Sequence, residues 1–512
     1  MTSLISDQLG LGFFILCALA VSNDALATSK TDARDKPLEI GSRKQLFVDD
    51  FVVAEQVRVK RALGQVVKAN GGNPVMVPDK PWEDDAFGCP ATVMHDGKKF
   101  RMWYRPWGEV SIAYAESTDG LRWVKPNLGL TDFNQEEAKK LGFRPPQPVT
   151  YSGKDNNLIP LFAQGFTCFM DTHEKDPGHR YKAAYGPHGK DSVAIAHSAD
   201  GFHWIPYNNG EPVTGRAADT TNQLLWDEEA KVYRLFTRTD FGTRGGPGEL
   251  RGTRNMTNPD VKADPKNWKT VRSWMLDREG RQEGKRRQIY SLTDWIYEGV
   301  HFGLMLAYEW PGDVSEGGHD LVKRHERDIC NYYITPSRDT YNWDLTWVYA
   351  GQPMIPRGGD GSFDKDLLVP TWNIITHQGE HWIYYGGLRE RHDRYPRSPG
   401  IGLAKLRLDG FAYLAAGEQE GTVLTKPLAI SGKKLELNLD ATNGEASVEI
   451  LDADGKAIKG FGEKDAKPFV NIDGVALEPR WSSQAGFSTL KGRILRLKFH
   501  LRKAKLYAFQ VH

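Results

Sequence analysis

A short motif that occurs three times constrains the fold of this chain more than any other feature. The motif is Ser-x-Asp-[Gly/Thr]-x-x-Trp, and its copies are Ser117–Trp123, Ser198–Trp204 and Ser337–Trp343. Asp followed by Gly between two strand-like runs is typical of a hairpin turn, because Asp bonds its own backbone and Gly supplies a positive φ. The Trp then falls on the next strand, where it can pack one sheet against another. The motif therefore indicates a repeated antiparallel β unit.

Each copy of the motif is preceded by the same succession of strand-like runs. Sets of four antiparallel strands that recur about every 70 to 80 residues are typical of propeller blades. Two degenerate units and a last one complete the count, so we predict a five-bladed β-propeller over residues 39–415. A series of β-sandwiches is the alternative. The strands predicted for the five units are 90–95, 99–104 and 110–116; 166–171, 181–185 and 193–197; 224–226, 232–238 and 252–255; 298–309; and 369–376, 382–386 and 400–408.

The composition changes after the repeats. From Gly417 onward Trp becomes sparse and the strand-like runs shorten, with a further Asp-Gly turn at Asp454. We predict a small β-sandwich accessory domain over 416–512. The fold class is therefore all-β, and the stretch 134–141 is the one helix-like segment expected after residue 27.

The N-terminus is typical of an export signal. An apolar run, 9–21, is followed by Ala25-Leu26-Ala27, which resembles a cleavage site. We predict a signal peptide over 1–27, a linker over 28–38 and a secreted or periplasmic protein without a membrane span. The net charge of +1 gives no electrostatic reason to expect a nucleic-acid partner. The sequence does not indicate an oligomeric state.

The cysteines do not indicate a disulfide framework or a metal centre. Removal of the predicted signal leaves Cys89, Cys168 and Cys330, an odd number without a Cys-x-x-Cys pair. We interpret them as small buried strand residues and expect neither a metal nor another cofactor.

At this point the residues resemble a known superfamily. The order of strand, Asp-Gly turn, strand ending in Trp-Tyr, and Ser-x-Asp-Gly-x-x-Trp is similar to the five-bladed propeller glycoside hydrolases of families 32, 43, 62, 68 and 130, and to exported bacterial glycosyl hydrolases of that group. The resemblance implies a carbohydrate substrate. The stretches that carry it are Leu46–Asp50, Arg287–Tyr290, Trp382–Gly387 and Ala504–Phe509.

Glycoside hydrolysis normally needs two carboxylates that face each other across the scissile bond. The resemblance implies that Asp85, at the start of the first blade, is the base or nucleophile. Glu298 is the predicted acid, although it falls in the fourth blade where the resembled enzymes use the third, and Asp294 is its substitute. Other carboxylates before inner strands are Asp219 and Asp366, which we expect to orient the sugar.

Further candidates for substrate binding are Arg287, His301 and the aromatic residues Trp295 and Trp372. The alternatives are that Arg287 belongs to a solvated charge run and that His301 is an inner-strand histidine. The loop 242–248 lacks the ending of a nucleotide loop, and Arg251 and Arg254 after it are expected to border the propeller funnel.

Three functions remain open from the sequence. The first is a glycoside hydrolase that acts on a polysaccharide or oligosaccharide. The second is a propeller that binds carbohydrate without catalysis. The third is a surface interaction scaffold. A polysaccharide lyase is a further possibility, and it would need Arg, His and Tyr instead of two acids.

Overall fold

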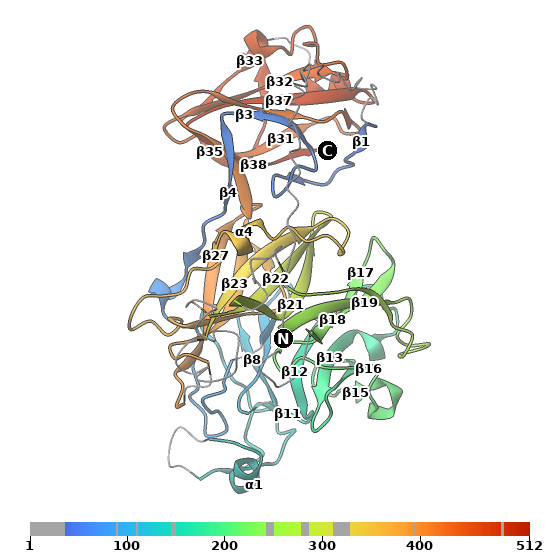
Figure 1. Ribbon diagram of the computed structural model, residues 1–512, viewed down its shortest axis with the longest axis vertical. Helices are drawn as coiled ribbons and strands as arrows, with labels where there is room; N and C mark the ends of the chain where they lie inside the picture. Colours follow the sequence, from blue (N-terminus) through green and yellow to red (C-terminus); the bar gives the residue numbers. More distant parts are fainter. Residues whose placement is uncertain are drawn as a thin grey trace, which may run out of the picture. The chain divides into compact units, whose positions relative to one another are not determined.

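The computed structural model describes residues 36–88, 91–108, 111–144, 150–241, 250–277, 286–310, 328–392, 395–482 and 486–512. Over these residues the chain is all-β, as the sequence predicts (Figure 1). The predicted signal peptide and Cys89 lie outside the described residues. Cys168 and Cys330 are buried, as expected.

The first three repeat units each form an antiparallel sheet. Sheet 1 contains β6 (Ala91–His95), β7 (Phe100–Tyr104), β8 (Ile112–Ser117) and β11 (Leu158–Ile159). Sheet 2 contains β12 (Ala163–Met170), β13 (Tyr181–Pro187), β14 (Ser192–Ser198), β15 (Ile205–Pro206) and β16 (Thr214–Gly215). Sheet 3 contains β17 (Gln223–Asp227), β18 (Val232–Phe241), β19 (Leu250–Asn258) and β20 (Lys269–Trp274).

The next two units share one eight-stranded sheet, whose halves are joined by the single parallel pair Cys330 and Leu367. We call the halves sheet 4 and sheet 5. Sheet 4 contains β21 (Arg287–Tyr297), β22 (Val300–Glu309) and β23 (Ile329–Ser337). Sheet 5 contains β24 (Leu367–Pro370), β25 (Ile375–His377), β26 (Glu380–Leu388), β27 (Pro399–Arg407) and β5 (Val67–Lys68). The N-terminal β5 thus pairs with β27 and supplies a strand to the last unit.

The repeated turns form as the motif predicts. The Asp119 carboxylate accepts the backbone N–H groups of Leu121 and Arg122, both at 2.8 Å, and the Ser117 hydroxyl accepts that of Gly120 at 2.8 Å. Asp200 and Asp339 make the same bonds in their own turns. The residue after each Asp has a positive φ, which explains why two of the three are Gly.

Five buried clusters link these sheets in succession. Sheets 1 and 2 meet around Trp103 and Tyr181, sheets 2 and 3 around Ile195 and Leu235, and sheets 3 and 4 around Phe236 and Met305. Sheets 4 and 5 meet around Leu304 and Ile383. The fifth cluster packs Phe100 of sheet 1 on Trp382 of sheet 5, with ring centroids 5.3 Å apart. The last sheet therefore contacts the first.

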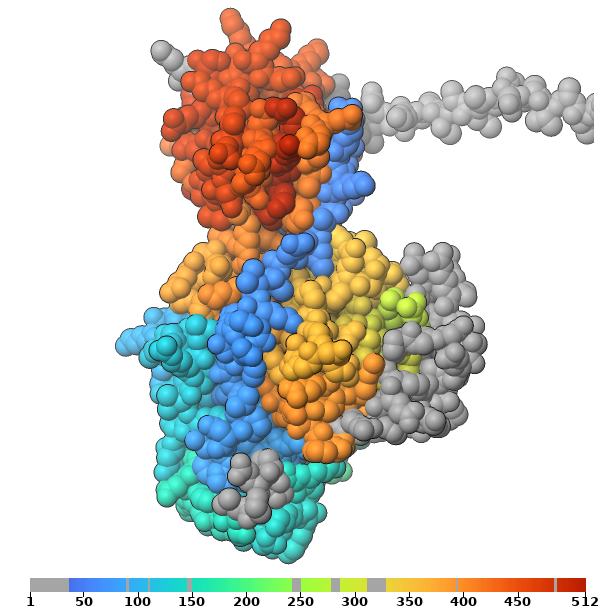
Figure 2. All heavy atoms as spheres, turned by 90° about the vertical axis from the view of Figure 1, so that its left-hand side faces the viewer, coloured from blue at the N-terminus to red at the C-terminus, as the bar shows by residue number. Residues whose placement is uncertain are grey.

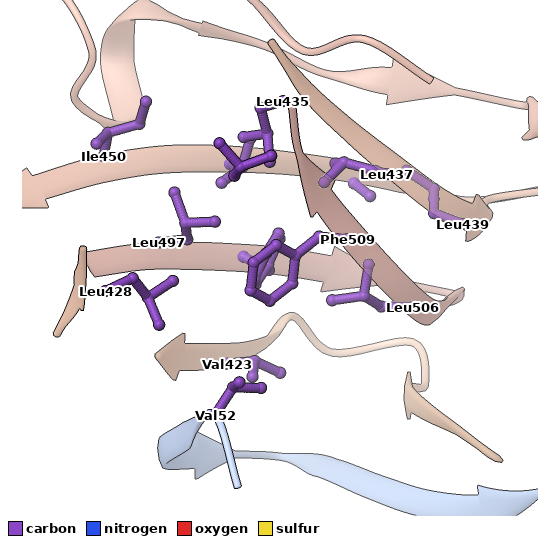
Figure 3. Packing of buried hydrophobic residues seen from close by; sticks show 14 of the residues in the cluster. Val52, Val423, Leu428, Leu435, Leu437, Leu439, Ile450, Leu497, Leu506 and Phe509 are labelled. Carbon is purple, nitrogen blue, oxygen red and sulfur yellow. The ribbon is translucent and has the colours of Figure 1, made fainter. Parts of the chain in front are cut away.

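Two further sheets share a core of aliphatic and aromatic residues near the C-terminus (Figure 3). One contains β1 (Leu38–Glu39), β3 (Val53–Val57), β29 (Gly421–Thr425), β30 (Leu428–Ala429), β32 (Glu445–Asp452), β34 (Phe469–Val470) and β37 (Ile494–Arg502). The other contains β2 (Gln45–Leu46), β4 (Val59–Leu63), β28 (Ala412–Ala416), β31 (Leu435–Asp440), β35 (Asp473–Leu477) and β38 (Ala504–Val511).

The segment 38–63 differs from its predicted place. The predicted boundary at residue 39 assigns it to the repeats, but β3 pairs with β29 and β4 pairs with β28. In Figure 2 the blue residues near the N-terminus lie against orange residues. Val52 and Phe47 are fully buried in the same core as Leu497 and Phe509. Strand pairing over long sequence separations depends on tertiary contacts that short-range patterns do not report.

Helices are few in the described part of the chain. The predicted helix is confirmed as α1 (Gln135–Lys140), where the Asn134 side chain accepts the N–H groups of Glu136 and Glu137. No helix among the described residues is long and apolar enough to cross a membrane. The remaining short elements are α4 (Thr346–Tyr349), η1 (Asn70–Gly72), η2 (Pro177–His179), η3 (Tyr207–Gly210), η5 (Glu463–Asp465), η6 (Phe487–Leu490) and the paired strands β9 (Phe133–Asn134) with β10 (Ser152–Gly153) and β33 (Ala466–Lys467) with β36 (Arg480–Trp481).

Candidate functional site

A polar cavity of about 200 Å³ lies where sheets 3, 4 and 5 meet a residue of sheet 1. Asp219 and Thr220 come from the loop before β17, Arg251 from β19 and Tyr290 from β21. The residues that line it are Arg105, Asp219, Thr220, Arg251, Tyr290, Leu306, Cys330, Leu367, Val369, Leu388, His392, Tyr395 and Arg397. Because several sheets contribute, this cavity is the candidate site.

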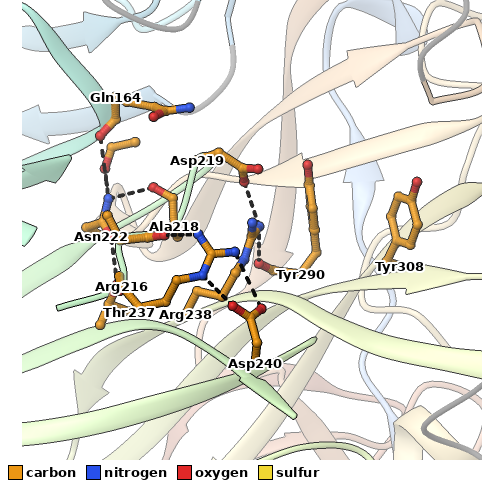
Figure 4. Close-up of polar contacts among 12 residues, drawn as sticks. Gln164, Arg216, Ala218, Asp219, Asn222, Thr237, Arg238, Asp240, Tyr290 and Tyr308 are labelled. Atoms are coloured by element: carbon orange, nitrogen blue, oxygen red, sulfur yellow. Dashed lines mark hydrogen bonds and ion pairs between the residues drawn. The ribbon is translucent and has the colours of Figure 1, made fainter. Parts of the chain in front are cut away.

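The loop that carries Asp219 is held rigidly by Asn222 (Figure 4). The Asn222 side chain, which is fully buried, accepts the backbone N–H of Ala218 at 2.8 Å and the Thr237 hydroxyl at 2.7 Å. Its amide group donates to the carbonyls of Ala218 and Gly165. A Cβ on Gly165 would lie 2.8 Å from the Ala218 carbonyl oxygen, so a larger residue would displace the loop.

Asp219 forms an ion pair inside the site. Its carboxylate lies 2.6 Å from a guanidinium nitrogen of Arg238, a residue that also donates to the Tyr290 carbonyl at 3.1 Å. Burial works to raise the pKa of Asp219, but Arg238, Arg251 and Arg216 outweigh it and hold that pKa well below its ordinary value. Asp219 is therefore a carboxylate at neutral pH, suited to accept hydrogen bonds and unsuited to donate a proton.

Two tyrosines stack beside this ion pair. The rings of Tyr290 and Tyr308 lie 5.1 Å apart, side by side in Figure 4. The guanidinium of Arg238 lies 4.6 Å from the centre of the Tyr290 ring, and that of Arg251 lies 5.2 Å from the same centre. Arg251 also faces Tyr308 at 5.5 Å. Such contacts are attractive because the face of an aromatic ring is negative.

His392 connects the two tyrosines. Its Nδ1 lies 3.1 Å from the Tyr308 hydroxyl and its Nε2 lies 3.4 Å from the Tyr290 hydroxyl. The Tyr308 hydroxyl donates in turn to the carboxylate of Asp328, which is fully buried. The Asp328 carbonyl accepts the backbone N–H of His392 at 3.3 Å, so the two residues are anchored to each other.

The described lining of the cavity is rich in positive charge. It includes Arg105, Arg251 and Arg397, against Asp219 as its one carboxylate. The guanidinium of Arg397 lies 4.1 Å from the centre of the Tyr395 ring. Guanidinium groups recognise carboxylates and similar anions through paired hydrogen bonds. Such guanidinium groups can bind a polar group that carries negative charge.

The first predicted carboxylate, Asp85, lies close to this cavity. Arg144 is 3.9 Å from its Oδ1 and stacks 3.8 Å from the centre of Tyr395, which lines the cavity. The neighbouring Asp84 is an anchor, since it is almost fully buried and accepts the backbone N–H groups of Ala86 at 2.7 Å and Arg144 at 3.2 Å. Burial raises the pKa of Asp84 to about 6.

Glu298 does not begin an inner strand, which corrects the sequence interpretation. Sheet 4 begins at Arg287 with β21, and Glu298 lies in the turn between β21 and β22 with a φ of 51°. Its carboxylate accepts the backbone N–H of Lys44 at 3.0 Å. A strand rises about 3.3 Å per residue, so Glu298 lies roughly 25 Å along the strand from Tyr290. The structure does not bring Asp85 and Glu298 into one cavity.

Asp294 and His301 also lie outside the described cavity lining. The Asp294 carboxylate is fully buried and lies 2.7 Å from His301 Nδ1, while its backbone exchanges hydrogen bonds with the Gln223 side chain. His301 Nε2 lies 3.8 Å from Asp227. Burial lowers the pKa of His301, but the two carboxylates outweigh it, so the net direction is upward. These residues join sheets 3 and 4 in the interior.

Of the remaining predicted binding residues, two lie near residues of the cavity and two lie in packed apolar clusters. Arg287 pairs with Glu309 at 2.8 Å, three residues before Tyr290, and Asp366 lies 3.2 Å from Arg391, next to His392. Trp295 stacks on Tyr297, 5.1 Å away and near Phe411, and Trp372 packs against the cluster between sheets 2 and 3. None of these four is part of the described cavity lining.

The sequence missed several residues of the site. Arg251, which was expected to border the funnel, lines this cavity, whereas Arg254 donates to the backbone of Arg216. No motif marks Arg105, Arg238 or His392 as a site residue. Arg105 and Arg238 lie at the ends of the predicted strands 99–104 and 232–238, which is a pattern that could have found them, whereas His392 lies beside no predicted strand.

The described residues also form an apolar cavity and a cluster of possible metal-ligand atoms. A cavity of about 240 Å³ beside α1 is lined mostly by apolar residues, among them Trp107, Phe133 and Phe162. In the C-terminal sheets Glu449, Glu463 and His500 have ligand atoms within 4.8 Å of one another. Lys498 already lies 3.0 Å from Glu449, and its positive charge opposes a cation there.

Comparison with known proteins finds solved structures of low similarity. No family model and no curated protein matches the chain. Among solved structures, an N-acetylgalactosamine deacetylase from F. plautii is 15% identical with a TM-score of 0.40, covering 69% of this chain and 97% of the other. A thermostable family-43 glycoside hydrolase is 11% identical with a TM-score of 0.39, covering 61% and 88%. The exo-inulinase from Aspergillus awamori is 12% identical with a TM-score of 0.36, covering 86% and 98%. Similarity at this level does not transfer function, so the cavity itself has to indicate it.

Proposed function

We propose that this chain is an exported enzyme that cleaves a carbohydrate polymer or oligomer, with its active site in the cavity beside Asp219. Sheets 1 to 5 would be the blades of a five-bladed β-propeller, and the C-terminal sheets a β-sandwich. The five successive clusters, the last of which joins sheet 5 to sheet 1, support this arrangement.

One observation carries the proposal. Asp219, Arg251, Tyr290 and His392 reach one polar cavity from separate sheets and loops. Sugars offer hydroxyl groups to carboxylates and guanidinium groups, and C–H faces to aromatic rings, so this lining suits a sugar. Cleavage requires in addition a group that moves protons, and Tyr290 and His392 are in place for that task.

Hydrolysis by two carboxylates remains one chemical route. Its base or nucleophile would be Asp219, which is held ionised, and Asp85 would supply the second carboxyl group from beside Arg144. A propeller that only binds carbohydrate would keep the cavity and show no turnover.

Export is part of the proposal. The apolar run 9–21 and the Ala25-Leu26-Ala27 site motivate it. We expect native protein from its source cells to begin near Thr28, in the secreted or periplasmic fraction. N-terminal sequencing that returned Met1 or Thr2 would remove this part of the proposal without affecting the cavity.

The experiment is a cleavage screen of the full chain without its predicted signal. Neutral and acidic polysaccharides are incubated with the protein, and new reducing ends are measured. We expect release from at least one glycan, and a loss of about a hundredfold in Asp219→Asn. Asp454→Asn, on an exposed turn of the C-terminal sheets, is the matched control. If the wild type bound a glycan but released no reducing ends, the proposed enzymatic activity would be refuted.

A further inference from the structure

The side chains of Asp328, Tyr308, His392 and Tyr290 form a hydrogen-bonded series that ends in the cavity. We propose that Tyr290 is the catalytic base and acid of a β-elimination that cleaves a uronate-containing glycan, and that the other three residues position and relay its proton. This inference rests on the proposed function and specifies its substrate class and reaction.

The hydrogen bonds assign the order of the protons. The one proton of the Tyr308 hydroxyl goes to the Asp328 carboxylate, so the Tyr308 oxygen accepts a proton from His392 Nδ1. His392 Nε2 is then the acceptor on the other side of the ring and faces the Tyr290 hydroxyl at 3.4 Å. Tyr290 can thus pass its proton to His392, and the buried Asp328 stabilises the resulting imidazolium through Tyr308.

Positive charge surrounds the Tyr290 ring. Arg238 and Arg251 face it at 4.6 and 5.2 Å. Guanidinium groups placed in advance beside a phenol stabilise the negative charge that develops on it, without reorganisation during the reaction. Asp219 holds Arg238 in this position through the 2.6 Å ion pair.

The same cavity contains the partners of a sugar carboxylate. Arg105 and Arg397 line it together with Arg251. A guanidinium that binds the carboxylate of a uronate neutralises it and makes the adjacent C5–H more acidic, which a β-elimination requires. A neutral sugar would offer no carboxylate to these arginines and no acidic C–H to Tyr290.

The reaction balances without a co-reactant. The Tyr290 phenolate takes the proton from C5, the C5–H electrons form the C4=C5 double bond, and the C4–O4 bond breaks. Tyr290 then gives that proton to O4 of the departing chain. One C–H and one C–O bond are lost, one C=C π bond and one O–H bond are formed, and nothing is oxidised or reduced overall.

The test separates this reaction from hydrolysis by its product. The full chain is incubated with polygalacturonate, alginate, glucuronan and hyaluronan, with their carboxyl-reduced forms, and with neutral glycans. Ultraviolet absorbance reports the new double bond, a reducing-end assay reports any cleavage, and mass spectrometry distinguishes the eliminated product, which is one water lighter than the hydrolysed one. We expect an unsaturated product from a uronate polymer and none from its carboxyl-reduced form.

Variants locate the chemistry on Tyr290. Tyr290→Phe keeps the stacked ring and removes the hydroxyl, so we expect it to fold and to lose at least about a hundredfold in kcat. Tyr341→Phe, an exposed tyrosine in a turn, is the matched control and should keep full activity. His392→Gln should lower kcat with little change in KM, whereas Arg251→Ala should raise KM for the uronate substrate. Thermal denaturation checks that each variant is folded.

The outcomes are distinct. Reducing ends without absorbance would overturn the elimination and leave the proposed function standing as hydrolysis. Cleavage by Tyr290→Phe at the wild-type rate would overturn the role of Tyr290. Binding with no cleavage of any glycan would overturn both proposals together.

Discussion

The two ends of β21 differ in what their polar side chains do. At the Arg287 end, Tyr290 lines a cavity with Asp219 and Arg251, and its neighbours can meet a ligand. At the Tyr297 end, Asp294 is bonded to His301 in the interior, and Glu298 caps the backbone of Lys44. Both ends carry residue types that catalysis uses. The difference is whether an open space faces them, which shows that residue type alone does not identify a site.

Asp84, which anchors the backbone of Arg144 beside the cavity, gives the largest expected effect on stability. Because its folded pKa of about 6 lies above the usual value of about 3.9, its contribution is fully present below about pH 4 and is lost as the pH rises through 6. We expect this group to lower the free energy of unfolding by about 3 kcal/mol between pH 4 and 7. In Asp84→Asn this part of the pH dependence should disappear. Urea denaturation across that range measures the free energy of unfolding. If its dependence on pH were the same in Asp84→Asn as in the wild type, the raised pKa of Asp84 would be contradicted.

Asp219 provides the largest expected effect on activity. Asp219→Asn removes the charge that orients Arg238 against Tyr290, and we expect a loss of about a hundredfold in kcat/KM because small displacements of reacting groups are costly. The activity is measured on whichever glycan the wild type cleaves. If kcat/KM of the folded variant stayed within threefold of the wild-type value, the cavity at this end of β21 would not be the active site.

His301, at the far end, should affect stability and not the reaction. Its raised pKa, the net result of Asp294 and Asp227 against burial, means that its contribution is present below the usual pKa of about 6.5 and is lost as the pH rises through the folded value. The stability advantage of the wild type over His301→Gln should therefore be larger at about pH 5.5 than at about pH 8.5. Chemical denaturation at the two values measures it. Equal differences at both would show that the pair is uncharged.

Glu298 should have the smallest effect on activity. It lies in the turn after β21 and bonds the Lys44 backbone, so we expect Glu298→Gln to keep its rate within about threefold, far from the hundredfold loss of a missing general acid. The measurement is the same glycan assay, with Asp219→Asn as the reference. A hundredfold loss of activity in Glu298→Gln would contradict this expectation and support the predicted pairing of Asp85 with Glu298.

Local patterns in the sequence determined the repeated units. Ser117, Asp119 and Gly120 make their bonds within a few residues, so the turns, the hairpins and the all-β class follow from short-range chemistry. The helix at 135–140 follows in the same way from its Asn134 cap. Among the site residues, Asp219 and Arg251 could be named because each lies beside a predicted strand of the repeat.

Tertiary structure alone decided which polar residues meet. Tyr290, His392 and Asp328 are far apart in the chain, and their hydrogen bonds exist because sheets 4 and 5 pack side by side. The place of Glu298 was decided by β21, which ends just before it. The predicted fourth unit began at residue 298 and therefore omitted this strand. The pairing of β4 with β28 is likewise a long-range contact. Short-range periodicity reports the direction of a side chain from its own strand, whereas a site depends on which other strands fold against it.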